Sequence, residues 1–285
     1  MKKLILTSCL VLSIFCATVA QAQQIPEKLG MVSYTFRNSF AKDVAVTLDT
    51  IKRMGITNIE FSNLFGRTAA DIKKELDARG MKCTSFGVSY DDFVKKTQEV
   101  AQNAKTLGAS YVRVASMPRN TKALLTIDTL KSAIKDFNRV GKILKEQYGL
   151  TFVYHNHGYE FPPYEKGTFF DYLMANTDPK YVSFEIDILW VAHPGADPVQ
   201  LINKYGDRFR LMHVKDLKKG VKSDFTGSTD KNNDVVLGTG QIDIAGVLKA
   251  AKKSKIQYFY IEDESEFATK QVPQSIAYLK SISFP

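Results

Sequence analysis

All four histidines of the chain lie between residues 155 and 213, and each stands within a few residues of an acid. His155 and His157 are two residues apart, so on a β-strand they would point to the same side, and Glu160 follows shortly afterwards. Imidazole and carboxylate groups transfer protons near neutral pH and bind divalent metal ions. This stretch therefore indicates a metal site or an acid–base site.

Three later stretches have a similar make-up. Glu185 and Asp187 share one face of a predicted strand. His213 and Lys215 share one face of the next strand, and Glu262 ends the last one. Any one of these side chains could be a hydrogen-bonded structural group or a surface charge. Their recurrence at strand ends favours a shared site, because buried charges need partners or a metal, and nitrogen and oxygen donors without cysteine suit Mn, Mg, Co or Zn.

Beyond residue 24 the sequence alternates short β-branched or aromatic runs with longer runs of helical period, as consecutive strand–helix units do. The predicted strands are Gly30–Phe36, Asn58–Ser62, Lys82–Val88, Tyr111–Ala115, Thr151–His155, Val182–Ile188, Arg210–Lys215 and Gln257–Glu262. The predicted helices are Val44–Met54, Thr68–Arg79, Phe93–Leu107, Ile127–Tyr148, Phe169–Asn176, Pro198–Tyr205, Ile244–Lys252 and Pro273–Ile282.

Eight such units, with no proline-rich or serine-rich linker between them, predict an α/β fold with a single (β/α)8 TIM barrel. The alternative is an open doubly wound sheet, which would carry a glycine-rich phosphate-binding motif after its first strand. Arg37-Asn38-Ser39 stands there instead. In a barrel, functional groups gather at the C-terminal ends of the strands, where the ionisable residues described above lie.

The first 22 residues have the three zones of a secretory signal peptide. Lys2 and Lys3 precede an apolar run from Leu4 to Val19, and Ala20-Gln21-Ala22 follows as a cleavage site. The run is shorter than a membrane span prefers, so we expect cleavage after Ala22 rather than a membrane anchor. The mature protein, residues 23–285, is then expected in the periplasm or outside the cell, with no stable membrane insertion.

The charge and the cysteine content of the chain limit the partners and the covalent links that we expect. The chain has a formal net charge of +9, but its basic residues are interleaved with acids, as in Lys73-Lys74-Glu75, so no nucleic-acid partner is expected. Cys83 is the single cysteine left after signal cleavage, which excludes an internal disulfide. A homo-oligomer is compatible with the sequence, which leaves the oligomeric state open.

Several motifs of the second half resemble those of the xylose isomerase-like TIM barrels, which include sugar phosphate isomerases/epimerases, ketose 3-epimerases, inosose dehydratases and, more distantly, endonuclease IV. The motifs are Tyr154–Phe161, Asp187–Trp190, His193–Pro198, His213–Asp216, Gly238–Asp243 and Ile261-Glu262. The first half is similar only in its strand–helix rhythm.

The resemblance implies a divalent metal ion held by Asp187, His213 and Glu262. In the family a fourth, acidic ligand comes from strand five, whereas this strand ends in His155 and His157. Glu160 is the nearest carboxylate and we expect it to be the fourth ligand, with His155 as the alternative.

The resemblance also implies proton abstraction next to a sugar carbonyl, through an enediolate that the metal stabilises. The expected catalytic residues are His155, His157, Lys215 and Glu262. The residues expected to contact the substrate are His193, Trp190 and Phe36.

We therefore expect a metal-dependent isomerase or epimerase that acts on an exported, unphosphorylated keto-sugar or glycoside, a small-molecule substrate. A 3-keto-glycoside lyase or dehydratase would use the same enediolate and is the alternative. A non-catalytic sugar-binding protein is a further option, whereas a DNA-repair nuclease would need more histidines and a basic groove. Gly238-Thr239-Gly240 is a weak signal for phosphate binding.

Overall fold

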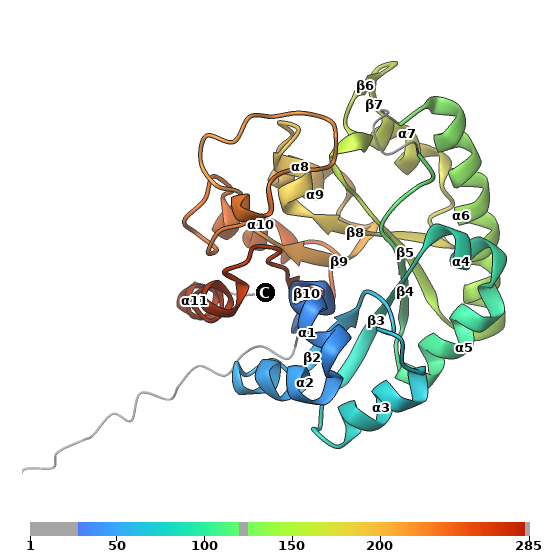
Figure 1. The fold of residues 1–285 in the computed structure, drawn as a ribbon. Coiled ribbons are helices and arrows are strands. Elements are labelled where there is room, and N and C mark those ends of the chain that lie inside the picture. Colours follow the sequence, from blue (N-terminus) through green and yellow to red (C-terminus); the bar gives the residue numbers. More distant parts are fainter. Residues whose placement is uncertain (1–27, 120–124, 283–285) are drawn as a thin grey trace, which may run out of the picture.

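The computed structural model describes residues 28–119 and 125–282, which form a closed barrel of parallel strands surrounded by helices (Figure 1). The barrel strands are β1 (Leu29–Val32), β2 (Asn58–Phe61), β3 (Lys82–Val88), β4 (Tyr111–Val114), β5 (Thr151–His155), β8 (Val182–Asp187), β9 (Phe209–Val214) and β10 (Tyr258–Ile261). β1 pairs with both β2 and β10, which closes the sheet. The predicted (β/α)8 barrel is thus confirmed, and the open sheet is wrong.

The helices lie outside the strands (Figure 1). They are α1 (Arg37–Lys42), α2 (Val44–Arg53), α3 (Ala69–Asp77), α4 (Tyr90–Lys95), α5 (Thr97–Leu107), α6 (Ile127–Tyr148), α7 (Phe169–Asn176), α8 (Ile188–Ala192), α9 (Pro198–Tyr205), α10 (Ile244–Ala251) and α11 (Ala268–Ser281). Thr68 and Asp71 form a capping box at the start of α3, as their spacing indicates. Among the described residues, no helix is both long enough and apolar enough to cross a membrane. The predicted signal peptide, residues 1–22, lies outside the described part of the chain.

Short elements complete the connections. Within residues 28–119 and 125–282, the 3-10 helices are η1 (Ser33–Phe36), η2 (Gly158–Glu160) and η3 (Lys231–Asn233), and β6 (Pro163–Tyr164) pairs antiparallel with β7 (Gly167–Thr168). These elements lie in the strand-to-helix connections, where a TIM barrel carries its functional loops.

Three predicted elements differ from the structure. The helix expected over Phe93–Leu107 is divided at Lys96 into α4 and α5. The first strand ends at Val32, because the Ser33 hydroxyl accepts the amide hydrogen of Ser62 and the chain turns into η1. The last helix begins at Ala268 and contains Pro273, whereas the prediction used this proline as the start. The amides of residues 270 and 271 donate hydrogen bonds to the carbonyl of Phe267, so the first turn of the helix lies before Pro273.

The barrel interior is filled in layers that follow the two-residue period of the strands. Val32, Tyr111, Val153, Leu211 and Tyr260 form an apolar cluster separate from the main core. Two residues after each of the last four members of this cluster the chain has an ionisable residue: Arg113, His155, His213 and Glu262. The interior therefore changes from apolar to charged toward the C-terminal ends of the strands, as the predicted parity requires.

Candidate active site

Four side chains from neighbouring strands meet at the mouth of the barrel. His155 ends β5, Asp187 ends β8, His213 lies on β9 and Glu262 directly follows β10. Asp187 Oδ2 lies 3.7 Å from His155 Nε2 and 3.8 Å from His213 Nδ1. His213 Nδ1 in turn lies 2.9 Å from Glu262 Oε2. The separations among Asp187, His213 and Glu262 suit one ion with ligand bonds of roughly 2.0–2.2 Å, and His155 lies beside Asp187 at the edge of this group.

The state of Asp187 supports a cation at this point. Its Oδ1 atom accepts the amide hydrogens of Leu189 and Trp190, whereas its buried Oδ2 atom has no hydrogen-bond partner. A buried carboxylate oxygen without a partner is unfavourable unless a cation satisfies it. The ligand atoms of Asp187, His213 and Glu262 all lie within 4.8 Å of one another. The residues present therefore fit a divalent metal ion.

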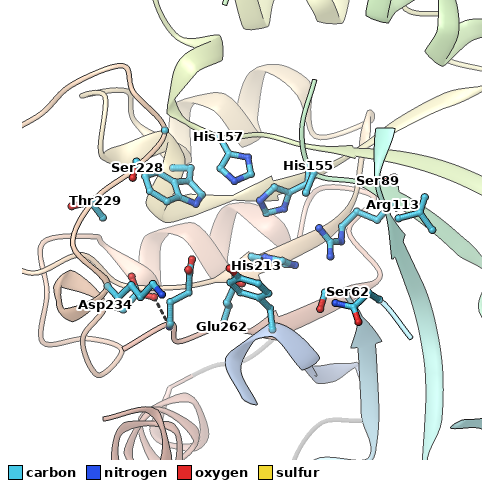
Figure 2. Close-up of a pocket in the computed structure, with 18 residues that line it drawn as sticks. Ser62, Ser89, Arg113, His155, His157, His213, Ser228, Thr229, Asp234 and Glu262 are labelled. Carbon is cyan, nitrogen blue, oxygen red and sulfur yellow. Dashed lines mark hydrogen bonds and ion pairs between the residues drawn. The ribbon is translucent and has the colours of Figure 1, made fainter. Parts of the chain in front are cut away.

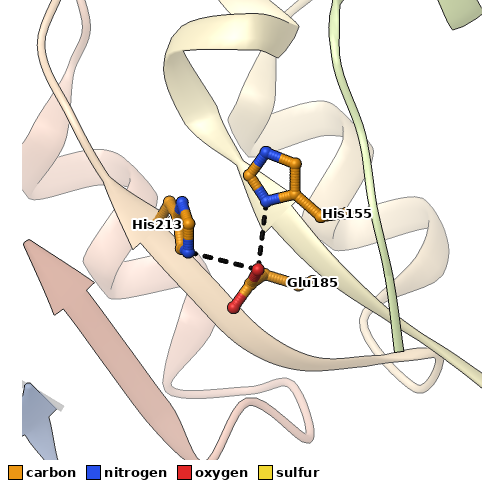
Figure 3. Close-up of side chains that lie close together, drawn as sticks. All are labelled: His155, Glu185 and His213. Carbon is orange, nitrogen blue, oxygen red and sulfur yellow. Dashed lines mark hydrogen bonds and ion pairs between the residues drawn. The ribbon is translucent and has the colours of Figure 1, made fainter. Parts of the chain in front are cut away.

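Glu185 lies behind both histidines (Figure 3). Its Oε2 atom is 3.0 Å from His155 Nδ1 and 3.2 Å from His213 Nε2. Each ring therefore places one nitrogen against Glu185 and the other toward Asp187. A carboxylate in this position fixes the orientation of a metal-binding imidazole and the nitrogen that carries its proton.

Glu60 and Arg113 extend this buried layer of charge. Arg113 Nε lies 2.8 Å from Glu60 Oε1 and 3.5 Å from Glu185 Oε2, and Glu60 Oε1 is also 2.8 Å from His213 Nε2. Arg113 thus partly compensates two carboxylates, although burial and the charge of Glu60 still raise the pKa of Glu185 well above its ordinary value. Sequence reasoning missed Glu60 and Arg113, although their inward parity on β2 and β4 was available as a signal.

Burial and neighbouring charges set the protonation of the four side chains. Burial lowers the pKa of His155, and the charge of His213 adds to this effect. Burial raises the pKa of Asp187 to about 6, although Lys215 and His213 lower it. For Glu262 the attraction of Lys215 and His213 outweighs burial, so its pKa lies below the ordinary value. His155 is therefore neutral and Glu262 ionised, the states that bind metals.

His213 is the exception among the four. Burial would lower its pKa, but Glu185, Glu262 and Glu60 surround the ring and hold the pKa well above the ordinary value. A metal ion on Nδ1 would take the place of the proton there.

Lys215 places a buried ammonium group beside the four side chains. Its Nζ atom lies 2.9 Å from Glu264 Oε1, 3.2 Å from Glu262 Oε2 and 3.6 Å from Asp234 Oδ2. Burial would lower the pKa of Lys215, but these carboxylates raise it well above the ordinary value. The lysine therefore stays charged and is held in place at the edge of the site.

A cavity of about 440 Å³ opens above these groups and is lined by His155, His213, Glu262 and Arg113 (Figure 2). His157 and Trp190 line it too, and their rings stack with centroids 5.6 Å apart. The loop after β9 contributes Ser228, Thr229 and Asp234, and the β2 and β3 ends contribute Ser62 and Ser89 on the other side. The volume is that of a small-molecule site.

Two residues predicted to contact the substrate lie elsewhere. His193 is buried against Trp190, with ring centroids 5.6 Å apart at 82°, and so supports the wall from behind. Phe36 packs in the hydrophobic core, because the chain leaves the sheet after Val32. Tyr34, two residues earlier, lines the cavity instead and is 38% exposed.

Glu160, the expected fourth ligand, also lies elsewhere. One of its oxygens accepts the amide hydrogen of His157 at 3.0 Å and the other accepts the hydroxyl of Tyr154. Tyr154 points away from His155 along the strand and packs against Phe137 of α6. Glu160 is thereby held beside the outer face of the barrel wall, and burial raises its pKa to about 8. The structure brings His155, the alternative ligand, next to Asp187 in its place.

Comparison with known families agrees with this geometry. Residues 48–282 match the family model described as "Xylose isomerase-like TIM barrel". The chain belongs to this family. Curated relatives in the family include inosose dehydratase of Geobacillus kaustophilus, 26% identical over 238 residues that cover 74% of this chain and 76% of that protein. Inosose dehydratase of Clostridium perfringens is 26% identical over 272 residues, which cover 84% of this chain and 90% of the relative.

Solved structures of the family superpose over nearly the whole barrel. A sugar phosphate isomerase/epimerase from Parabacteroides distasonis has a TM-score of 0.73 and 26% identity, and the match covers 93% of this chain and 98% of that one. The IolI protein, described with a binding zinc atom, has a TM-score of 0.66 at 15% identity over 89% of this chain and 95% of that one, which shows a common fold. The resemblance inferred from the motifs is therefore confirmed, and the similar proteins are isomerases, epimerases and dehydratases.

Proposed function

We propose that this protein is a metal-dependent enzyme that removes a proton from the carbon next to a sugar carbonyl. Returning that proton elsewhere makes it an isomerase or epimerase of a keto-sugar or glycoside. The observation that carries this proposal is the meeting of His155, Asp187, His213 and Glu262 around the Oδ2 atom of Asp187, which accepts no hydrogen bond, directly beneath a cavity of small-molecule size.

The proposed reaction gives separate roles to the metal ion, to the residues that would hold it and to Lys215. A divalent metal ion (Mn, Mg, Co or Zn), when bound, stabilises the negative charge that develops on the carbonyl oxygen of the sugar. His155, Asp187, His213 and Glu262 would hold it. Lys215 Nζ keeps its proton and adds a fixed positive charge beside the carboxylates of Asp187 and Glu262.

His157 and Glu262 are the groups placed to move the proton. Burial lowers the pKa of His157 to about 3, so its ring is neutral and can accept a hydrogen bond from a sugar hydroxyl group. Trp190 stacks on His157 and offers an apolar surface to the C–H face of a sugar ring.

Elimination is the second candidate reaction, and the dehydratase names of the curated relatives favour it. Loss of the same proton expels a leaving group that stands beta to the carbonyl. The product is then an unsaturated ketone, as for a dehydratase or a 3-keto-glycoside lyase.

We further propose an unphosphorylated substrate met outside the cytoplasm, in the periplasm or beyond the cell. The signal-peptide pattern of residues 1–22 supports the location. The glycine turn at 238–240 supports the lack of a phosphate, because the amides of Gly238 and Gly240 both donate to Asp216 Oδ2 at 2.9 Å. These amides are thus satisfied within the protein.

The test uses Mn-loaded protein, a panel of ketoses and 3-keto-glycosides, and NMR in deuterated water. Deuterium at the carbon next to the carbonyl shows isomerase or epimerase chemistry, and an unsaturated ketone shows elimination. If neither signal appears with any of the sugars, the proposal is contradicted. The Asp187→Asn and Glu262→Gln variants serve as controls, because a non-catalytic sugar-binding protein that uses no metal would keep its sugar affinity in both.

A further inference from the structure

A second hollow adjoins the cavity above the metal ligands. It has a volume of about 390 Å³ and lies between the end of β3, the loop after β2 and helices α4 and α5. Ser62, Asn63, Val88 and Ser89 line both hollows. The two spaces therefore share a wall made of short polar and small side chains at the ends of β2 and β3.

The first cavity is closed on the opposite side. There the loop after β9 packs closely, since a Cβ atom on Gly227 would lie 2.6 Å from the Tyr159 ring and 3.2 Å from His157 Cβ. The base of this loop is fixed as well, because Lys218 and Asn233 form a backbone hydrogen bond of 2.8 Å. Ser62 and Ser89 lie across the cavity from Ser228 and Thr229 of this loop (Figure 2). A ligand too long for the first cavity can extend toward β2 and β3.

The shared wall is built rigidly. The Ser62 amide donates to Ser33 Oγ at 2.8 Å, and the two hydroxyls lie 2.9 Å apart. Phe65, in the left-handed region at φ 50°, stacks on Phe40 with ring centroids 5.1 Å apart. Its amide donates to Asn63 Oδ1. The wall between the two hollows is thus formed before any ligand arrives.

The second hollow has an apolar floor and a polar rim. Phe86 and Val100 are buried and Leu64 is half-buried. The rim is formed by Asp92, Lys96, Glu99 and Asn103, and Lys96 Nζ pairs with Asp92 Oδ1 at 2.9 Å. A sugar ring has the matching character, with apolar C–H faces and an edge of hydroxyl groups that hydrogen-bond to such side chains.

We propose that this hollow binds the second ring of a glycoside whose first ring lies above the metal ligands. The inference rests on the proposed function and makes it more specific, because the substrate is then a two-ring glycoside rather than a free monosaccharide. The glycosidic bond would cross the shared wall at Ser62 and Ser89. In the elimination reaction the second ring would belong to the leaving group.

The test measures sugar affinity by isothermal titration calorimetry with Mn-loaded protein. The probes are two matched pairs, D-fructose with lactulose and 3-keto-glucose with 3-keto-cellobiose. Asn103→Trp on α5 fills the second hollow, and Gln102→Trp places the same side chain at the exposed neighbouring position, which serves as a control.

We expect the two-ring member of at least one pair to bind about tenfold more tightly than its one-ring partner. Asn103→Trp should abolish this gain and leave the one-ring affinity unchanged, whereas Gln102→Trp should change neither. Equal affinities within both pairs, or a gain that survives in Asn103→Trp, would overturn the second-ring site while leaving the proposed function intact. Failure of all four sugars to bind would overturn the proposed function itself.

Discussion

His155 and His213 share a single carboxylate oxygen behind their rings. The ring centroids lie 4.6 Å apart at 60°, and each ring places one nitrogen within 3.2 Å of Glu185 Oε2. Two of the proposed metal ligands, on different strands, are therefore oriented by one residue on the strand between them. Their remaining nitrogens face Asp187, so the proposed metal site depends on the carboxylate of Glu185.

Glu185→Gln should weaken metal binding. The amide keeps the shape of the side chain but cannot accept a hydrogen from both rings with the same strength, so we expect Mn affinity to fall about 10- to 100-fold. Titration calorimetry of metal-free protein measures this change. Glu75→Gln, on the surface of α3, is the matched control. Unchanged Mn affinity in Glu185→Gln would show that the two rings hold their orientation without this carboxylate.

His155→Ala and Glu160→Gln should separate the two candidate ligands on strand five. Because His155 Nε2 lies 3.7 Å from Asp187 Oδ2, its loss should remove most of the bound metal. The Glu160→Gln variant should retain as much bound metal as the wild type, because Tyr154 and His157 hold the Glu160 side chain elsewhere. Metal content after dialysis, measured by plasma mass spectrometry, decides the question. The reverse pattern would restore Glu160 as the ligand.

Glu160 should also make stability depend on pH. Burial raises its pKa from about 4.5 in the unfolded chain to about 8 in the folded protein. The protonated form is therefore favoured by folding, and this contribution is complete below pH 4.5 and is lost as the pH rises through 8. Wild type should lose unfolding free energy between pH 5 and pH 9 relative to Glu160→Gln, as urea denaturation at both pH values would show. A constant difference between the two proteins would contradict this.

Asp216→Asn should loosen the loop after β9. The Asp216 carboxylate accepts four backbone amide hydrogens, those of Leu217, Gly238, Gly240 and Ile242. An asparagine side chain has only one oxygen to offer, so we expect a loss of about 1.5–3 kcal/mol of unfolding free energy. Chemical denaturation measures it, with Asp207→Asn on the surface as the control. A loss no larger than that of the control would contradict this role.

The barrel and the meeting of Asp187, His213 and Glu262 could be predicted because strand period and strand order are local properties of the sequence. Parity alone placed Asp187, His213 and Glu262 on inward faces, and the closed sheet brought them together. Glu160 was misplaced because η2 turns it back beneath Tyr154, a residue of the opposite face.

Other parts of the site depend on contacts between distant segments. Arg113 and Glu60 pair across the barrel interior. The residues next to each of them in the sequence do not indicate this pairing. Phe36 was assigned to the mouth because the first strand was extended past Val32. The hydrogen bonds between Ser33 and Ser62 end that strand early, and they form only once β2 has docked.

The location of a bound metal ion tests the central claim most directly. Crystals of the protein, purified without chelator and supplied with Mn, can be measured by anomalous scattering at the Mn edge. We predict one peak at roughly 2.0–2.2 Å from His155 Nε2, Asp187 Oδ2, His213 Nδ1 and Glu262 Oε2. A metal peak elsewhere, or none among these four side chains, would contradict both the site and the enzymatic role built on it.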